Sequence, residues 1–320
     1  MSVTSEITRI KTNISNAYTE LKNKNATIPS VENSEGLASS IASIQTGGGE
    51  PITKGIIINE CDSDGFVIDM SIVGMTTIPD YYFYQAGLST AWLSRLGSKL
   101  QMSNVASIGQ YAFYNCTSLS ITSLPNSVAS IGQYAFYNCA NLALTSLPNN
   151  LTLIGQYAFY ECSKLAVTEL SSGVTSIDSN AFYGCTNLAL TSLPNSVTSI
   201  GSYAFNKCPN LTIKTIPSGV TKLNNSTFRY CSKLTEITVL GDITSIGTYV
   251  FETCSALKKF VLPNITGVPT LSKSNAFTGS GIGNKIGYIY VPDTMVSDFQ
   301  SASNWSVYAS QIKGISELGG

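Results

Sequence analysis

Apolar residues recur along the middle of the chain with a period of 23 residues. In each of seven consecutive units a phenylalanine stands three residues before a cysteine, and a leucine stands three residues after it. The cysteines that mark the period are Cys116, Cys139, Cys162, Cys185, Cys208, Cys231 and Cys254. A period kept this strictly over seven units predicts a solenoid, in which the coils stack and bury one continuous core.

Each unit predicts a short helical turn followed by a short strand. In the first unit we expect the strand over 119–124, and Pro125 ends it because proline lacks the N–H that a strand ladder needs. The buried side of the helical turn is expected to comprise Ile108, Ala112, Phe113 and Cys116. The fold class that these units predict is an α/β repeat solenoid.

The order of residues in a unit resembles the BspA-like leucine-rich repeat family, whose pattern is I-x-x-x-A-F-x-x-C-x-x-L-x-x-I-x-I-P. The resemblance covers roughly residues 78–292. It implies a leucine-rich repeat solenoid and almost nothing about chemistry, because one fold hosts many functions. Many proteins that resemble this repeat are bacterial surface adhesins.

The cysteine column favours a place in the core over disulfides or a metal site. A free cysteine behaves as a small apolar residue that buries well. Neighbouring coils stack at about 4.8 Å, whereas Cβ atoms joined by a disulfide lie about 3.8 Å apart. Zinc needs four converging ligands. We therefore expect no metal and no cofactor.

The strand segment departs from the family pattern in the first five units. Counted from the leucine as one, the family places apolar residues at positions four and six, but these units carry threonine or lysine at position four. Their aliphatic residues stand one place earlier, at Ile121, Leu144, Val167, Leu190 and Ile213. Because side chains alternate between the two faces of a strand, there are two possibilities. Either a bulge returns these residues to the core, or they form an exposed aliphatic ridge that marks an interface.

Composition and charge exclude several classes of function. Charged residues make up 12% of the chain and the net charge is −1, so the clustered cations of a nucleic-acid binder are lacking. The sequence has no histidine, which excludes histidine-based acid–base catalysis and histidine metal sites. No run approaches the roughly 18 apolar residues of a membrane span, and charged residues interrupt any signal peptide at the N-terminus. We expect a protein that is not an enzyme, binds no nucleic acid and does not insert into a membrane.

Tyrosines stand in two columns along the repeats, in a region of low charge. No charged residue occurs from Leu100 to Tyr160. Neutral amides and hydroxyls beside aromatic rings favour a glycan or a protein of a host cell surface as partner. The alternative is that the rings only stack on their equivalents in the next coil and cover the core. The predicted partner surface comprises Tyr111, Tyr134, Tyr157, Tyr203, Tyr114, Tyr137 and Tyr160.

The first 46 residues follow a different pattern. Apolar residues alternate spacings of three and four, as in the seam of a coiled coil, and isoleucine at both seam positions favours trimers. The predicted seam comprises Ile7, Ile10, Ile14, Ala17 and Leu21. The alternative is a local helical hairpin that packs on its own chain.

The same segment is similar to the N-terminal segment of phage tail and baseplate proteins. The similarity runs from Ile7-Thr8-Arg9-Ile10 through Asn33-Ser34 and Leu37-Ala38, over roughly residues 5–45. It implies that this segment attaches the protein to a virion, beside other tail or baseplate proteins, or forms a homotrimer.

The chain is expected to divide into five parts. These are an α-helical, coiled-coil assembly module over 1–46, a glycine linker over 47–50, a β cap with a degenerate first repeat over 51–104, the solenoid over 105–281 and a C-terminal cap over 282–320. The leading hypothesis is a phage or prophage tail protein that attaches to the host surface through the solenoid. The alternative is a BspA-like adhesin of the bacterial cell surface.

Overall fold

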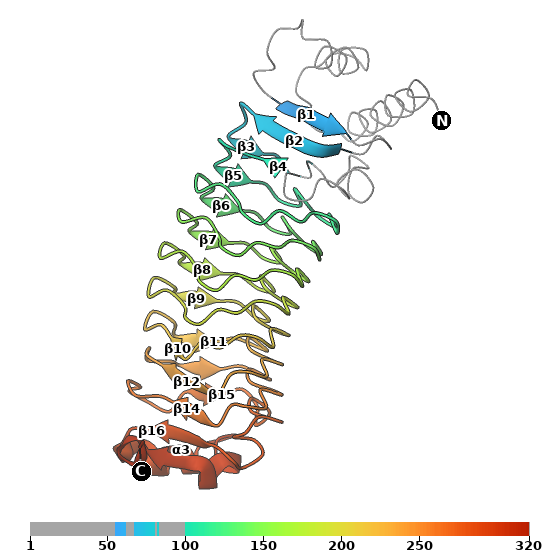
Figure 1. The fold of residues 1–320 in the computed structure, drawn as a ribbon. Coiled ribbons are helices and arrows are strands. Elements are labelled where there is room, and N and C mark those ends of the chain that lie inside the picture. The colour runs from blue at the N-terminus through green and yellow to red at the C-terminus, as the bar shows by residue number, and fades with distance from the viewer. Residues whose placement is uncertain (1–54, 62–66, 81, 83–99, 320) are drawn as a thin grey trace, which may run out of the picture.

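The computed structural model describes residues 55–61, 67–80, 82 and 100–319. From β3 onward these residues form coils that stack along one axis, and the two ends of the stack are far apart (Figure 1). The expected module over 1–46 lies outside the described residues, and so does the glycine linker. The coiled-coil seam therefore stays a prediction, at Ile7, Ile10, Ile14, Ala17 and Leu21.

One two-residue strand per coil builds a parallel ladder along the solenoid. Each strand consists of one polar or exposed residue followed by a buried Ile or Leu. Ser107 and Ile108 of one coil pair with Ser130 and Ile131 of the next coil. Successive coils are thus in register over one whole repeat. A six-stranded sheet contains β3 (Thr77–Ile78), β5 (Ser107–Ile108), β6 (Ser130–Ile131), β7 (Leu153–Ile154), β8 (Ser176–Ile177) and β9 (Ser199–Ile200). A three-stranded sheet continues it with β11 (Lys222–Leu223), β13 (Ser245–Ile246) and β15 (Thr270–Leu271).

A second parallel sheet occurs only in the C-terminal coils of the described chain. Its strands pair in the order β10-β12-β14-β16-β17. They are β10 (Thr215–Ile216), β12 (Glu236–Val239), β14 (Lys259–Val261), β16 (Tyr288–Val291) and β17 (Ile312–Gly314). In β12 the buried residues Ile237 and Val239 alternate with the half-buried Glu236 and Thr238, as the pleat of a strand requires.

The segment from 119 to 124 is not a strand, so the expectation for this part of the repeat is wrong. Ile121 and Leu124 are both buried although they stand three residues apart, whereas residues three apart in a strand point to opposite faces. The chain leaves regular extended geometry here, and this returns the shifted aliphatic residues to the core. The exposed ridge is therefore also wrong, because its five members are at most 1% exposed: Ile121, Leu144, Val167, Leu190 and Ile213.

The segment between the short strand and the cysteine is a series of tight turns and not the expected helical turn. Tyr111 and Asn115 adopt left-handed backbone, with φ of 54° and 58°. This conformation costs about 1–2 kcal/mol for a residue with a side chain. The cost is offset because alternate N–H groups donate to the next coil, from Tyr111 to the carbonyl of Gln133 at 2.9 Å and from Phe113 to that of Ala135 at 2.7 Å.

Two stacked columns fill the centre of the solenoid. The phenylalanine rings stack at 5.0 to 5.6 Å from Phe113 to Phe277, and every ring is fully buried. The seven cysteines are free and buried. The Cys139 thiol donates to the carbonyl of Phe113 in the preceding coil at 3.0 Å, and the later cysteines repeat this contact. The prediction that the cysteine column belongs to the core is confirmed.

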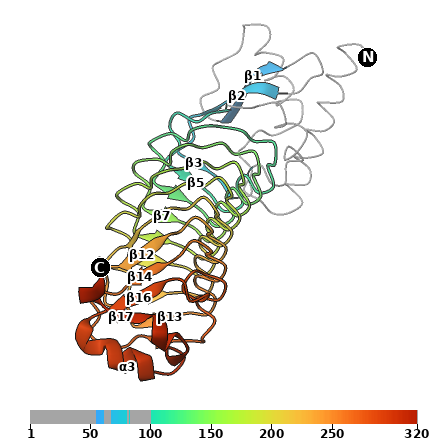
Figure 2. The same ribbon diagram turned by 60° about the horizontal axis from the view of Figure 1, so that its bottom comes forward.

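Other elements lie at the two ends of the stack. At the N-terminal end β1 (Gly55–Cys61) pairs antiparallel with β2 (Val67–Val73), and β4 (Leu100–Gln101) pairs parallel with β2. At the C-terminal end Figure 2 shows α3 (Val296–Ser301) below the last strands. The indole of Trp305 is buried there and donates to the Pro269 carbonyl at 2.8 Å. The remaining elements of this end are the 3-10 helices η1 (Asp293–Met295), η2 (Ser306–Gln311) and η3 (Ile315–Glu317).

Candidate functional site

Tyrosines at one position of the tight turns form a first tyrosine column, made of Tyr111, Tyr134 and Tyr157. Each ring stacks on the next at 4.6 Å between centroids, with interplanar angles of 13° and 6°. The coils themselves are spaced by about 4.7–4.9 Å, because strands hydrogen-bond at that distance. The pitch of the solenoid therefore brings equivalent rings into stacking contact.

A second tyrosine column runs beside the first, three residues later in each coil, and is made of Tyr114, Tyr137, Tyr160 and Tyr183. Its rings stack at 4.6 to 4.7 Å with interplanar angles of at most 8°. The two columns also contact each other within a coil, at 5.5 to 5.7 Å and with tilted planes. Seven rings thus form one continuous aromatic face, in which every ring is partly exposed.

The tyrosines of the first column adopt left-handed backbone, and the same conformation occurs in the coil where asparagine replaces the tyrosine. The φ angles are 57° at Tyr134, 57° at Tyr157, 59° at Asn180 and 60° at Tyr203. The rings do stack on their equivalents in the next coil, as the alternative interpretation expects. Binding of a partner by the same rings is an additional property that the stacking leaves open.

Tyr203 departs from the predicted surface. Asn180 takes the place of a tyrosine in the coil between Tyr157 and Tyr203, so the stack ends at Tyr157. The Tyr203 side chain is 38% exposed and, within the described part of the chain, stacks on no other ring. Six of the seven predicted residues therefore lie together. Tyr203 is separated from them by the coil that contains Asn180.

The second column changes its chemistry after Tyr183. The Lys207 ammonium lies 5.1 Å from the centroid of the Tyr183 ring, a cation–π contact at the end of the stack. The next residue in the column is Asn206, whose side-chain oxygen is buried without a hydrogen-bond partner. Buried polar atoms are rarely left unsatisfied, so this position is unusual in an otherwise regular array.

Beyond Asn206 a charged cluster takes over the same column, which the sequence analysis missed. The Arg229 guanidinium lies 4.7 Å from the Tyr230 ring and 5.2 Å from the Tyr249 ring, and it forms an ion pair with Glu252. Arg229 and Glu252 occupy the coil position that holds tyrosine in the earlier repeats. Aligning the repeats by that position alone would have shown that an ion pair replaces two stacked rings.

Stacking also changes the acidity of the phenols. Burial raises the pKa of Tyr134, Tyr137 and Tyr160, and negative charge on neighbouring groups raises it further. The effect is largest at Tyr160, whose pKa rises to about 12. These three phenols therefore stay neutral over the physiological range, and their hydroxyls remain able to donate hydrogen bonds.

A metal centre and a membrane helix find no support in the described part of the chain. No three His, Cys, Asp or Glu residues there come together in a way that could hold a metal ion. None of the helices in the same part has the length and hydrophobicity needed to span a bilayer.

The fold and the columns define a leucine-rich repeat solenoid with an aromatic face. The model of the BspA type leucine-rich repeat region, in six copies, matches residues 76–189 and 165–283. These ranges cover more than half of the chain, which therefore belongs to the BspA type leucine-rich repeat family.

The chain is also similar to solved structures of leucine-rich repeat proteins. The leucine-rich repeat protein of T. pallidum (TpLRR) is 30% identical over 66% of this chain and 91% of its own, with a TM-score of 0.45. A leucine-rich repeat protein from Bacteroides ovatus is 24% identical over 77% of this chain, with a TM-score of 0.52. The match spans 60% of the Bacteroides protein, and because the identity is only 24% it shows the fold alone. The comparison with curated proteins gives no match.

These comparisons do not support the similarity to phage tail proteins. The family match begins at residue 76, beyond the segment over 5–45 that carries the similarity. The two solved structures described above are those of leucine-rich repeat proteins. The virion attachment of this chain and its homotrimer stay predictions.

Proposed function

We propose that this chain is a non-enzymatic adhesin of the bacterial cell surface that binds neutral glycans through its aromatic face. The observation that carries the proposal is the continuous stack of seven tyrosine rings in two adjacent columns. Its family favours the cell surface over a virion tail, because many proteins with this repeat are surface adhesins.

The chemistry of the face supports a neutral ligand. The coils that carry most of the rings contain no charged residue up to Tyr160. Within the stack the ring faces contact one another, so the surface presents ring edges and phenol hydroxyls. Amide and hydroxyl groups beside the rings can exchange hydrogen bonds with sugar hydroxyls. Phosphate or sulfate groups would need cations that this part of the chain lacks.

Repetition of the rings supports binding to a polymer. A single exposed tyrosine contributes little, but equivalent rings stand one coil apart along the whole face. Neighbouring units of a polysaccharide can contact several coils at once, so weak contacts combine into useful avidity. The ligand class that fits best is a neutral polysaccharide of a host or neighbouring cell.

Affinity electrophoresis of the full chain tests the proposal. The chain is run in native gels that contain dextran, yeast mannan or, as an anionic comparison, polygalacturonate. The test variant combines Tyr157→Asn with Tyr160→Asn, because the array itself carries asparagine at both coil positions, at Asn180 and Asn206. We expect dextran or mannan to retard the natural chain and the variant to lose at least tenfold in affinity.

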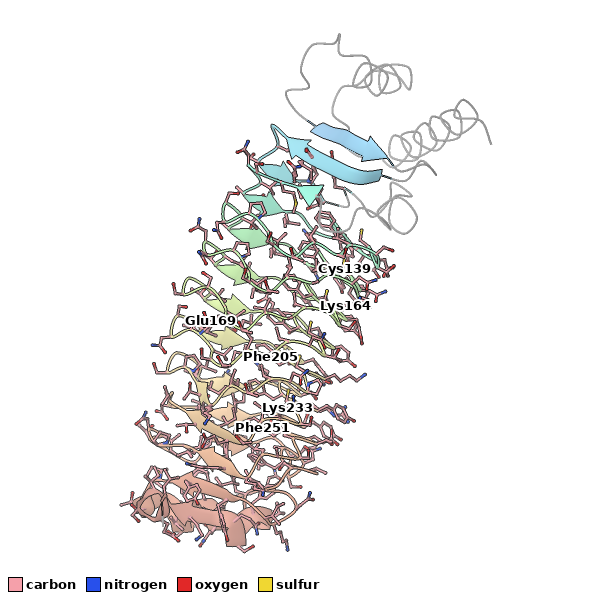
Figure 3. The ribbon with its side chains drawn as sticks, in the orientation of Figure 1. Cys139, Lys164, Glu169, Phe205, Lys233 and Phe251 are labelled. Carbon is pink, nitrogen blue, oxygen red and sulfur yellow. The ribbon has the colours of Figure 1, made fainter. Side chains whose placement is uncertain are left out.

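A matched control replaces two exposed side chains on another side of the coil. Thr145→Asn with Ser146→Asn changes the same number of residues at exposed positions just before Leu147. Figure 3 shows that Glu169, at the coil position equivalent to Ser146, lies toward the edge opposite to Cys139. The control should bind like the natural chain. Binding to polygalacturonate alone, or equal loss in both variants, would contradict the proposal.

A further inference from the structure

Three coils carry the segment Tyr-Ala-Phe-Tyr, which places one ring in each tyrosine column. In each of these coils the N–H of the second tyrosine donates to the carbonyl of the first at 3.1 to 3.2 Å, which closes a tight turn. The two rings are tilted by 43° to 49°, with centroids 5.5 to 5.7 Å apart. These same-coil pairs are Tyr111 with Tyr114, Tyr134 with Tyr137, and Tyr157 with Tyr160.

The other four coils of the array lack such a pair. Asn180, Asn206 and Glu252 each replace one of the two tyrosines, and Ser226 with Arg229 replaces both. The backbone is left-handed at the first position in these coils as well. The chain therefore presents paired phenols in three coils and unpaired phenols in others, on the same backbone.

Exposure is greater at the unpaired tyrosines than at the paired ones. Tyr203 and Tyr249 are each 38% exposed, and Tyr230 is 37% exposed. All six paired tyrosines are less exposed than these three. A reagent that responds to exposure alone would act first on the unpaired tyrosines, whereas a reaction that needs two neighbouring phenols is favoured in the paired coils.

One-electron oxidation can join two neighbouring phenols. Each phenol gives one electron and one proton to a peroxidase, and the two phenoxyl radicals form a carbon–carbon bond between ring carbons that lie next to the hydroxyls. The hydrogens on those two carbons then move to the oxygens, which restores both phenols. Hydrogen peroxide takes up the two electrons and two protons and gives two molecules of water. The product is dityrosine, and the chain loses two hydrogen atoms.

The tilt of the same-coil rings suits this bond better than stacking does. Rings joined by a carbon–carbon bond meet at their edges and are twisted about the bond, and the same-coil rings are already tilted. Rings within a column instead turn their faces to each other and must leave the stack before their edges can meet. Two groups held in one coil also react as parts of one molecule, which favours coupling within the chain over coupling between chains.

We infer that the three same-coil pairs are an oxidative crosslinking site, where a peroxidase and hydrogen peroxide join the two tyrosines of a coil as dityrosine. The inference goes beyond the proposed function and does not depend on it, because no glycan takes part in the reaction. The new bonds would connect the two tyrosine columns covalently and fix the aromatic face.

Oxidation of the full chain by a haem peroxidase and hydrogen peroxide tests the inference. Dityrosine fluorescence is measured in the monomer band of a denaturing gel, after a short reaction at several protein concentrations. We expect dityrosine in that band, in an amount per chain that does not change with protein concentration. Dityrosine that occurs only in dimers and larger products would overturn the inference.

A triple variant removes one phenol from each pair and keeps every ring. It combines Tyr111→Phe, Tyr134→Phe and Tyr157→Phe, because phenylalanine can stack but has no hydroxyl to oxidise. Dityrosine in the monomer band should fall about tenfold, because the remaining phenols have no partner in their own coil. The second tyrosine column is intact in this variant. Unchanged dityrosine would therefore show that stacked rings couple, and would overturn the assignment to same-coil pairs.

A matched control removes three phenols that are more exposed. The variant that combines Tyr203→Phe, Tyr230→Phe and Tyr249→Phe should form as much dityrosine in the monomer band as the natural chain. Melting followed by circular dichroism should show the same midpoint for both triple variants. An equal loss of dityrosine in the two variants would show that exposure decides the reaction, and would overturn the inference.

A further variant measures a tilted contact outside the two columns. Tyr288 and Tyr290 lie at the C-terminal end with centroids 6.3 Å apart and an angle of 59°. Because this distance exceeds that of the same-coil pairs, Tyr288→Phe should remove only a small part of the dityrosine in the monomer band. A loss as large as that of the first triple variant would overturn the assignment to the Tyr-Ala-Phe-Tyr coils.

Discussion

The coils from 107 to 221 (the earlier half) and the coils from 222 to 291 (the later half) share one core. They differ in their surface residues and in the secondary structure of the segment that follows the repeat leucine. Phenylalanine and cysteine columns run through both parts without a break. The earlier coils carry stacked tyrosines and, before β10, no strand between the leucine and the end of the repeat. The later coils carry ion pairs and a regular parallel sheet, which begins with β10 in the last of the earlier coils and continues to β17 beyond residue 291.

The difference on the strand side follows from a shift of one residue. In the earlier coils the buried residues after the leucine are two and five places on, such as Ile121 and Leu124 after Leu119. In the later coils they are three and five places on, such as Ile237 and Val239 after Leu234. Only the second spacing matches the alternation of a strand, so the second sheet is regular in these coils.

The same shift decides where charge can be placed. The coil position that buries Leu190 and Ile213 holds Glu236 and Lys259 in the next two coils. There the side chains face outward, and Glu236 pairs with Lys214 at 2.8 Å and with Lys259 at 3.5 Å. A regular strand therefore frees this position from the core, which lets charge replace aliphatic side chains.

The largest expected effect comes from placing a charge in an earlier coil, at the position that holds Glu236 and Lys259 in the later coils. Leu144→Asp buries an unpaired carboxylate where the natural side chain is fully buried, which should cost about 4 kcal/mol or more. Thr145→Asp, one residue later and exposed, should change stability by less than about 0.5 kcal/mol. Urea unfolding followed by circular dichroism measures both. Similar losses in the two variants would show that the spacing does not control burial.

The sequence predicted the solenoid, its period and the residues of its core, because these depend on repetition and hydrophobicity. It also located the five shifted aliphatic residues, at Ile121 and its equivalents, as the place where the repeat is unusual. It could not decide their burial, since the choice between a strand and an irregular segment depends on contacts between coils. The short strands at Ser107–Ile108 and its equivalents were also missed. Two residues are too few to show a periodic pattern, and these strands are defined by their pairing with the next coil.

The tight turns show a second limit. Tyrosine rarely adopts left-handed backbone, so no local propensity predicts φ of 57° at Tyr134. Hydrogen bonds to the next coil impose it, as for Tyr134, whose N–H donates to the Gln156 carbonyl at 2.9 Å. The replacement of tyrosine by Asn180 was visible in the sequence, but the end of the first ring stack at Tyr157 follows from the structure.

The next effect concerns the charged cluster of the later half. Arg229→Ala removes the ion pair with Glu252 and the contacts with Tyr230 and Tyr249, and it leaves the largely buried Glu252 carboxylate unpaired. A loss of about 2 kcal/mol is expected. Lys233→Ala, an exposed cation in the same coil, should have little effect. Adding Glu252→Ala to Arg229→Ala should recover part of the loss, and strictly additive losses would argue against the pair.

A smaller effect should appear at alkaline pH and belong to the earlier half. The folded-state pKa of Tyr160 is about 12, above the usual value of 10.0. The unfolded chain therefore loses this proton first, and the stability that the stack contributes is complete below pH 10 and falls as the pH rises toward 12. Tyr160→Phe should lose less stability over the same range, measured by urea unfolding. An equal loss in both proteins would show that other groups cause the alkaline limb.

The smallest effect should appear at acid pH and belong to the later half. Hydrogen bonds and charge from Lys214, together with the charge of Lys259, lower the pKa of Glu236 below 4.5. The contribution of this carboxylate to stability is therefore present above pH 4.5 and lost as the pH falls through the folded-state value. Because exposed ion pairs contribute little, the change in the urea midpoint should be small. Glu236→Gln should remove that part of the acid dependence and leave the alkaline limb unchanged. If it altered the alkaline limb instead, the two halves would not titrate independently, and the division of the solenoid into a neutral stacked part and a charged paired part would fail.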